Sequence, residues 1–275
     1  MEEKRISCWE DFEREIGEVF RRYEKRREEA RPGWISPPLF RGQSMACWPL
    51  ETTLERYTER PYTMREYYEL IRNYVKSPVE SVTEKRWDIG EYPEAGPEPH
   101  GPPFGDEFYE FMVYLRHHGF PSPLLDWSQS PYVAAFFAFR SAAGADRQTD
   151  LKDEAAIYCL HEYWAVGKTW GKHDPHIIGL GPNVRTTPRH FRQQSWYTIC
   201  RVLRDGRYSY AGHEEVFKKG DPDQDVLVKY RIPLSEWRQF LDKLSLMNIN
   251  AYSLFGSEEG LMETLAYRAI INKPL

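Results

Sequence analysis

The stretch over residues 124–139 constrains the fold most, because it joins a short apolar segment to a helix that is apolar on every side. Ser130 and Pro131 stand between the two parts, in the order typical of a helix N-cap followed by an N1 proline. We therefore predict a strand that turns directly into a buried helix, with Asp126 and Ser128 in the turn. The polar groups of such a turn suit an anion or a polar ligand, but they can equally serve only to cap the helix.

A second stretch, Leu39-Phe40-Arg41-Gly42-Gln43, also ends an apolar segment in a polar cluster. A glycine there lets the backbone turn or approach a ligand closely. An arginine can present its guanidinium to a phosphate or carboxylate, or form an ordinary salt bridge. We predict that residues 39–42 and 124–131 lie side by side, with Arg41, Asp126 and Ser128 facing one cleft.

The spacing of apolar residues predicts the other elements. Helices are expected over residues 8–30, from Thr63 to about Lys76 with a continuation after Pro78, from Phe108 to a paired His117-His118 before Gly119, from Ser235, and at the C-terminal end. Strands are expected over residues 155–160, from near Gln194 and over residues 226–232, with an irregular segment at residues 161–187. This order predicts an α+β fold with a central mixed or antiparallel sheet, continuous or split, flanked by helices.

Between Asp88 and Asp106 lie five prolines and four glycines, which indicate a surface insertion without regular structure. We do not interpret it as a domain boundary, because the two polar stretches lie on either side of it. The expected organisation is an N-terminal amphipathic helix over residues 1–31 packed on a single domain over residues 32–275.

Composition narrows the class of protein. The 275 residues are 41% apolar and 15% aromatic, which is ample for a packed core, and the net charge of −5 provides no overall basic field to attract nucleic acid. Four widely separated cysteines, without metal-ligand spacing, favour reduced thiols and no metal. The chain opens on charged residues and contains no apolar run of about 20 residues, so we expect a cytoplasmic protein without a signal peptide or a membrane partner.

Several short motifs together resemble the FRG domain family, which is named after a Phe-Arg-Gly triplet. They are Phe40-Arg41-Gly42-Gln43, His117-His118-Gly119, Leu124-Leu125-Asp126-Trp127-Ser128, Ala134 to Ala138, Arg189 with Gln193, and Leu254-Phe255-Gly256-Ser257-Glu258-Glu259-Gly260-Leu261. The resemblance covers most of residues 32–268. Gly256 stands where the family usually has Pro, and Ser195 where Gly often follows the Gln pair.

Part of the same pattern is similar to ADP-ribosyltransferases of the Arg-Ser-Glu class. Arg41-Gly42, Ser128-Gln129-Ser130 and Ala134 to Ala138 match in order and spacing, whereas Arg192-Gln193-Gln194-Ser195 stands where that class has its glutamate. The resemblance implies an ADP-ribosyltransferase-like scaffold and cleavage of the nicotinamide–ribose bond of NAD through an oxocarbenium-like transition state. In such a reaction an Arg holds the dinucleotide and a carboxylate stabilises the developing positive charge.

Three hypotheses follow. The first is an NAD-consuming transferase in which Arg41, Gly42, Gln43, His117 and Ser128 bind NAD. Its catalytic residues are Arg41, Asp126, Ser128 and Gln193, with Asp126 as the carboxylate and Glu214, Glu215, Glu258 or Glu259 as replacements. The acceptor, protein or nucleic acid or water, is open, and an intracellular toxin or phage-defence effector is the role suggested by analogy.

The second hypothesis is a non-catalytic module on the same scaffold that binds a nucleotide or a nucleic-acid end. The third is a nuclease or other hydrolase using His117, Asp126 and Arg41. The carboxylate discriminates among them. A transferase needs one within reach of Arg41, whereas a hydrolase needs a histidine and a carboxylate within hydrogen-bond reach of each other.

Overall fold

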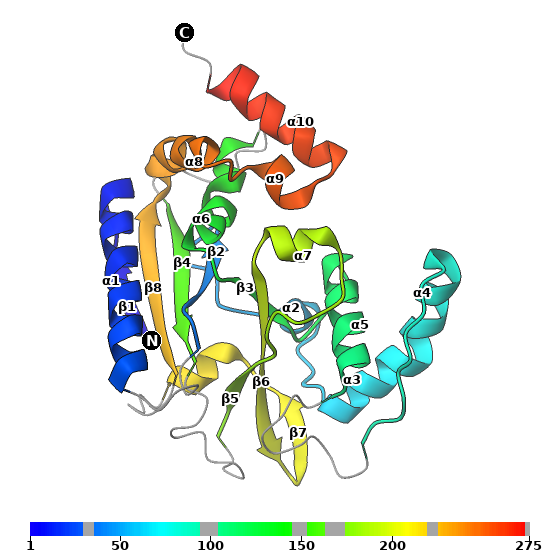
Figure 1. The fold of residues 1–275 in the computed structure, drawn as a ribbon. Coiled ribbons are helices and arrows are strands. Elements are labelled where there is room, and N and C mark those ends of the chain that lie inside the picture. The colour runs from blue at the N-terminus through cyan, green and yellow to red at the C-terminus, as the bar shows by residue number, and fades with distance from the viewer. Residues whose placement is uncertain (30–35, 94–103, 145–152, 163–173, 219–224, 273–275) are drawn as a thin grey trace.

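The computed structural model describes residues 1–29, 36–93, 104–144, 153–162, 174–218 and 225–272. Its described strands form one open sheet of eight strands, with helices packed against it (Figure 1). The strand order is β1-β8-β4-β2-β3-β6-β5, and β7 pairs with the end of β6. Only β1 and β8 run parallel, so the sheet is mixed and the α+β prediction is confirmed. Of the two alternatives for the sheet, the continuous one is correct.

The strands are β1 (Glu2–Arg5), β2 (Leu39–Gln43), β3 (Leu125–Ser128), β4 (Glu154–His161), β5 (His176–Gly179), β6 (Ser195–Arg204), β7 (Arg207–Tyr210) and β8 (Val226–Pro233). The α-helices are α1 (Trp9–Glu29), α2 (Thr53–Tyr57), α3 (Met64–Leu70), α4 (Lys76–Thr83), α5 (Asp106–His117), α6 (Pro131–Phe139), α7 (Pro188–Arg192), α8 (Trp237–Leu246), α9 (Ala251–Phe255) and α10 (Glu258–Ala266). Shorter turns are η1 (Ile71–Val75), η2 (Arg140–Ala143), η3 (His213–Phe217), η4 (Leu234–Glu236) and η5 (Tyr267–Ile271). Within these described ranges, no helix is both long and apolar enough to cross a membrane.

The predicted turn from strand to buried helix is confirmed at β3 and α6. Ser130 is the N-cap of α6, where its Oγ accepts a hydrogen bond from the Val133 N–H at 3.3 Å, and Pro131 is the first helical residue. The apolar helix packs beside β2 and β4, in a core that also includes α1 and α8. Burial on several sides explains why α6 lacks the polar face that surface helices carry.

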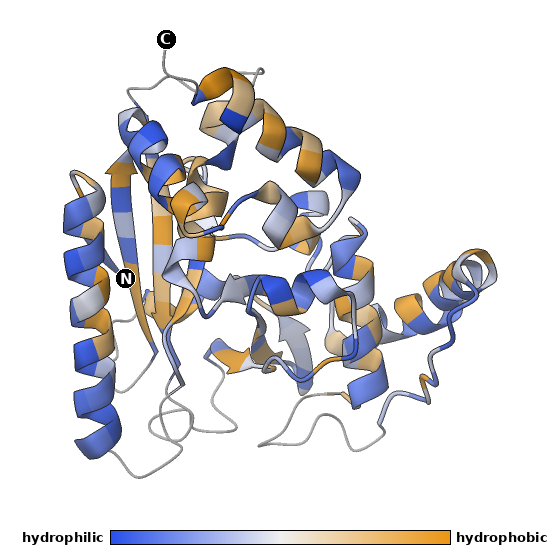
Figure 2. Ribbon diagram, turned by 45° about the horizontal axis from the view of Figure 1, so that its top comes forward, coloured by the Kyte–Doolittle hydropathy of each residue, from blue (hydrophilic) through white to orange (hydrophobic). Residues whose placement is uncertain are grey.

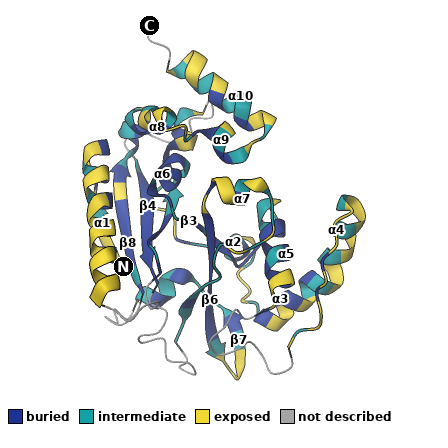
Figure 3. Ribbon diagram, in the orientation of Figure 1, coloured by how far each residue is buried: buried dark blue, intermediate teal, exposed yellow. Residues whose placement is uncertain are grey.

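The N-terminal amphipathic helix is confirmed as α1, which buries Trp9, Phe12, Ile16 and Val19 in that core. Figure 2 shows hydrophilic residues along its remaining length, and Figure 3 shows its outward residues exposed. The strand β1 that precedes it was not expected, because its sequence is Glu-Glu-Lys-Arg. Its position at the edge of the sheet, parallel to β8, allows these charges to face solvent.

Other elements correct the prediction in detail. The helix expected to pause at Pro78 continues through η1 and α4, since the widened π-type turn of η1 accommodates a residue without an N–H. The segment expected to be irregular contains β5, while residues 163–173 lie outside the described part. The strand expected near Gln194 begins at Ser195, directly after the unexpected short helix α7.

The Pro/Gly-rich insertion lies outside the described residues over positions 94–103. Its described ends are fixed in a second core, where Trp87, Ile89 and Phe104 are buried against α3 and α5. This second core also covers β6, whereas the first core covers β8, β4 and β2. The two halves of the sheet therefore have different helical partners, and they adjoin at β2 and β3.

Candidate functional site

The two polar stretches meet at the junction between β2 and β3, as predicted. The strands pair at one position, Phe40 with Ser128, and the register does not continue beyond it. Arg41 then bridges the separating strands, because its Nη1 donates a hydrogen bond of 2.8 Å to the main-chain oxygen of Asp126, 85 residues away in the chain. A side chain thus takes the place of the backbone hydrogen bonds that the diverging strands cannot form.

Asp126 is held between two guanidinium groups. Its Oδ2 lies 3.1 Å from Arg41 Nη1, and its Oδ1 accepts hydrogen bonds from Nε and Nη2 of Arg116. Burial alone would raise the pKa of Asp126, but the charges of Arg116 and Arg41 outweigh it and hold the pKa well below its usual range. Arg116 is fixed in turn by Thr53, whose Oγ1 lies 3.2 Å from Nη1. The Asp126 side chain remains 45% exposed and lines an open space.

That space is a cleft of about 330 Å³, which we call the basic cleft. It is lined by four arginines, Arg41, Arg56, Arg116 and Arg189, and by two carboxylates, Asp126 and Glu51. Burial, followed by repulsion from Arg116 and Arg41, lowers the pKa of Arg56, and burial also lowers the pKa of Arg189. Positive charge is therefore in excess here, although the chain as a whole carries −5. Such a site attracts anions.

Ser128 and Gln193 both line the basic cleft, and both are buried. The Ser128 hydroxyl donates to the main-chain oxygen of Gln193 at 2.8 Å and accepts from the Ser130 N–H at 3.0 Å. The Gln193 side-chain Nε2 donates to the main-chain oxygen of Leu254 at 3.3 Å. These bonds tie the turn before α6 to the start of β6 and to α9.

Gly42 and Gln43 also line the basic cleft, but their clearest contacts are with the protein itself. A Cβ atom at Gly42 would lie 1.8 Å from the main-chain oxygen of Ala134, so the glycine is required for the close approach of β2 and α6. Gln43 Nε2 donates to the main-chain oxygen of Pro49 at 3.1 Å. This bond holds the loop that carries Trp48 and Glu51.

The paired histidines have separate positions. His117 lines the basic cleft and shares a hydrogen bond of 2.8 Å between Nε2 and the hydroxyl of Tyr197, whereas His118 lies outside the cleft lining and bonds the main-chain oxygen of Tyr114. Burial and then the nearby charge of Arg189 lower the pKa of His117 to about 4. The imidazole is therefore neutral near pH 7. Its hydrogen bond goes to a phenol, and not to the carboxylate that the hydrolase hypothesis requires.

Some residues of the basic cleft were missed. Arg116 directly precedes the paired histidines, so its place in that motif was the signal that could have found it. Trp48, Glu51 and Arg56 follow β2 in a loop and a short helix, and no spacing rule marks them. The alternative carboxylates Glu214, Glu215, Glu258 and Glu259 are not among the residues lining the cleft. Across the described ranges, no group of three or more His, Cys, Asp and Glu side chains is arranged to hold a metal ion.

The fold and the site thus define an α+β protein with an arginine-rich cleft at the centre of its sheet. Comparison with protein families gives a match to the FRG domain over residues 36–147, which confirms the predicted resemblance. Residues 36–147 therefore resemble the FRG domain. The matched segment contains Arg41, Arg116 and Asp126, and it ends before Arg189. No curated protein and no solved structure matches the chain significantly.

Proposed function

We infer that this chain binds NAD in the basic cleft, cleaves its nicotinamide–ribose bond and transfers ADP-ribose to an acceptor. The observation that carries this proposal is the meeting of Arg41, Asp126 and Ser128 at one anion-attracting cleft, from stretches far apart in the chain. The similarity to ADP-ribosyltransferases rests on two of these residues, Arg41 and Ser128, while Asp126 is the carboxylate nearest to Ser128 in the chain. A carboxylate within reach of Arg41 is also the condition that separates this hypothesis from the others.

The arginines suit the pyrophosphate of a dinucleotide, because charge-assisted bonds from guanidinium to phosphate are strong and directional. Arg116 uses all three of its guanidinium nitrogens on Asp126 and Thr53, whereas the contacts of Arg41 with Asp126 use Nη1, so the binding role belongs to Arg41, Arg56 and Arg189. Trp48, half-exposed on a loop at the cleft, offers an aromatic surface for a base or the nicotinamide ring.

The carboxylate that stabilises the transition state is better assigned to Glu51 than to Asp126. Each oxygen of Asp126 faces a guanidinium, so the triad of Arg41, Asp126 and Arg116 carries net positive charge and is poorly suited to shield a cation. Glu51 lines the same cleft, and no ion pair within 4.0 Å is found for it in the described part of the chain. In the proposed reaction the nicotinamide–ribose bond breaks with its electron pair going to nicotinamide. The acceptor nucleophile forms a bond to the same ribose carbon and loses its proton to water.

A non-catalytic nucleotide-binding module is the second candidate. The neutralisation of Asp126 by two arginines favours it, because binding requires donors and no exposed carboxylate. Reaction with NAD separates the two. Free nicotinamide is measured by chromatography after incubation, with water, protein, DNA and RNA offered in turn as acceptors.

For the transferase, we expect nicotinamide release that falls at least about 100-fold in Glu51→Gln, the loss typical of removing one electrostatic catalytic group. Glu13→Gln on the exposed face of α1 is the matched control and should retain full activity. Binding of NAD by calorimetry without nicotinamide release from any preparation would support the binding module. Absence of both binding and release would overturn both candidates.

A role as an intracellular toxin or phage-defence effector is part of the transferase proposal, since consumption of cytoplasmic NAD harms a cell. Expression of the wild-type chain should then arrest growth and lower cellular NAD, whereas Glu51→Gln should do neither. Equal growth with both chains at equal expression contradicts the toxin role and leaves the biochemical assay to decide the reaction.

A further inference from the structure

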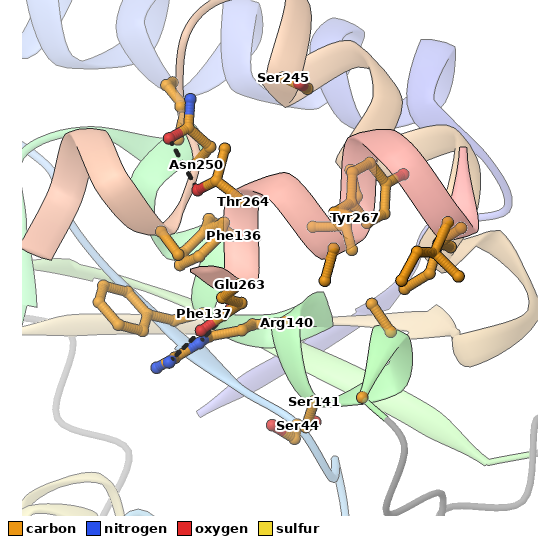
Figure 4. Close-up of a pocket in the computed structure, with 18 residues that line it drawn as sticks. Ser44, Phe136, Phe137, Arg140, Ser141, Ser245, Asn250, Glu263, Thr264 and Tyr267 are labelled. Carbon is orange, nitrogen blue, oxygen red and sulfur yellow. Dashed lines mark hydrogen bonds and ion pairs between the residues drawn. The ribbon is translucent and has the colours of Figure 1, made fainter. Parts of the chain in front are cut away.

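A second and larger cavity lies beside the basic cleft, between α6, α8 and the C-terminal helices α10 and η5. Its volume is about 800 Å³, within the range of about 300–1,000 Å³ typical of small-molecule sites. We call it the C-terminal cavity. The side chains Phe136, Phe137, Leu241, Tyr267 and Ile270 form much of its lining, and Figure 4 shows Phe136 and Phe137 on the side opposite the helix that carries Thr264 and Tyr267.

The larger polar side chains around the C-terminal cavity are already bonded within the protein, and the small hydroxyls of Ser44, Ser141 and Ser245 complete the polar part of the lining. The Thr264 hydroxyl donates to Asn250 Oδ1 at 3.2 Å (Figure 4). The Tyr267 hydroxyl donates to Asp242. Arg140 and Glu263 form a bidentate ion pair at the same wall. The walls therefore present apolar surface, with few donors or acceptors that need a partner. The cavity is open to solvent, with Ile270 exposed at its edge, so a ligand could enter it from outside. A concave, mostly apolar site of this size is typical of small-molecule binding.

The rim next to the basic cleft carries positive charge. The ring of Phe255 lies between two guanidinium groups, with its centroid 4.5 Å from the Cζ of Arg140 and 4.5 Å from that of Arg189. Arg189 lines the basic cleft and Arg140 lines the C-terminal cavity, while Phe137 and Ser44 line both. Glu263 uses the Nε and Nη2 atoms of Arg140 and leaves its Nη1 outside the ion pair.

We propose that the C-terminal cavity binds a single-chain amphiphile, with its hydrocarbon chain against the apolar walls and its anionic head beside Arg140. Burial of the methylene groups of the chain supplies the affinity. The charge of Arg140 favours an anionic head over a neutral one, and the carboxylate of Glu263 reduces this preference because it partly neutralises that charge. The site adjoins the basic cleft and does not depend on the proposed reaction.

The test uses the full chain and the fluorescent fatty acid 11-(dansylamino)undecanoic acid, displaced by dodecanoate or by dodecan-1-ol. We expect saturable probe binding that dodecanoate displaces at lower concentration than the alcohol. Ala266→Trp places an indole at a lining position and should weaken probe binding at least about tenfold, as expected when ligand volume is filled. Ala269→Trp, at an exposed position on η5 outside the lining, is the matched control and should bind as the wild type does.

The head group is tested by charge variants that leave the apolar walls intact. Glu263→Gln removes the competing carboxylate and should strengthen dodecanoate binding several-fold, whereas Arg140→Gln should weaken it about tenfold. Dodecan-1-ol should compete equally in both variants. Circular dichroism and thermal melting identify any variant that is unfolded, in which case the remaining variants decide.

Absence of saturable probe binding, or undiminished binding in a folded Ala266→Trp chain, overturns the proposal. So does a wild-type dimer that only Ala266→Trp dissociates, because a second copy would then occupy the cavity. Identical competition by dodecanoate in wild-type, Glu263→Gln and Arg140→Gln chains contradicts the assignment of the anionic head.

Discussion

The negative charge of Asp126 is used to position two arginines that come from β2 and α5. Asp126→Asn keeps the shape of the side chain but leaves Arg41 and Arg116 without their counter-charge. We expect the free energy of unfolding to fall by about 1–3 kcal/mol, less than for a fully buried pair because the carboxylate is 45% exposed. Urea denaturation measures this change.

The matched control for Asp126→Asn is Glu69→Gln, which breaks the exposed pair of Glu69 with Arg65. Its effect should stay below about 0.5 kcal/mol. An Asp126→Asn chain as stable as the wild type would show that the carboxylate does not hold the junction together. If that chain were also inactive, Asp126 would be the catalytic group after all.

Arg41→Lys separates ligand binding from folding. Lysine keeps the positive charge and can still reach one oxygen of Asp126, and it lacks the Arg41 Nε, for which the described part of the chain provides no hydrogen-bond partner. The planar guanidinium is lost, so a phosphate contact worth about 1.5–3 kcal/mol is weakened. We expect the Kd for NAD, measured by calorimetry, to rise at least about tenfold, with a melting temperature close to that of the wild type.

If Arg41→Lys bound NAD as tightly as the wild type, Arg41 would be only a structural ion-pair partner. If Arg41→Lys lost much of its stability and also lost NAD binding, the conclusion would be the same. Arg65→Lys, at an exposed pair on α3, is the control for the exchange of one basic side chain for the other.

At the scale of elements, the close packing of β2 against α6 requires a residue without a Cβ atom at position 42, which is Gly42. Gly42→Ala would bring a Cβ atom to 1.8 Å from the Ala134 main-chain oxygen and 2.7 Å from the Ala138 nitrogen, and backbone atoms cannot rotate away as a side chain can. We expect a loss of about 3 kcal/mol or more, the upper range for overpacking. Thermal or urea denaturation checks this result.

Gly17→Ala is the matched control, because nothing lies within 4 Å of its added Cβ and the residue is exposed on α1. Alanine is the better helix former, so this variant should gain about 0.5–1 kcal/mol. Equal stability of both variants would mean that β2 and α6 are free to separate.

The elements that could be predicted are those whose signals are local. The Ser130 cap and Pro131 mark the start of α6 within two residues, and a capping box at Thr63 marks that of α3. By contrast, β1 is four charged residues that are extended because β8 provides hydrogen bonds, and β5 is a strand through its pairing with β6. The sequence of a strand does not show which other strand will pair with it, so β1 and β5 could not be predicted.

The same limit applies to the site. Arg41, Asp126 and Ser128 could be placed together because each ends an apolar strand in a polar cluster, a pattern visible along the chain. Arg56 and Glu51 reach the basic cleft only through the path of the loop after β2. Their contribution is a result of tertiary packing, and neither residue type nor spacing distinguishes them from ordinary surface charges.

For the whole molecule, buried histidines determine how stability depends on pH. Burial lowers the pKa of His117 and of His161 to about 4, and that of His213 to about 3, from an ordinary value of 6.5. Below pH 6.5 the unfolded chain binds protons that the folded chain excludes, so stability falls as the pH falls toward 4. About one pH unit above 6.5 and higher, these groups are almost entirely neutral in both states and contribute almost no slope.

We therefore expect the melting temperature to decrease steadily between pH 6.5 and 4.5, with little effect of these histidines between pH 7 and 8. His213→Gln should flatten the acid limb, because glutamine can still contact Thr198 but binds no proton. His118→Gln, at an exposed position, should leave the slope unchanged. If the melting temperature fell equally steeply below pH 6.5 in the wild type, His213→Gln and His118→Gln, the carboxylates alone would cause the loss of stability in acid.

The sheet is weakly paired between β2 and β3, where one residue pair joins the two strands. On one side lie β1, β8, β4 and β2 with their helices, and on the other lie β3, β6, β5 and β7 with theirs. A ligand in the basic cleft would touch Arg41 on one side and Arg189 on the other, and so would link the two halves of the sheet. Binding should therefore slow amide hydrogen exchange at the facing edges of β2 and β3. Without the ligand these edges are joined by one backbone pair, by the contacts of Arg41 with Asp126 and by the apolar residues that pack across the junction.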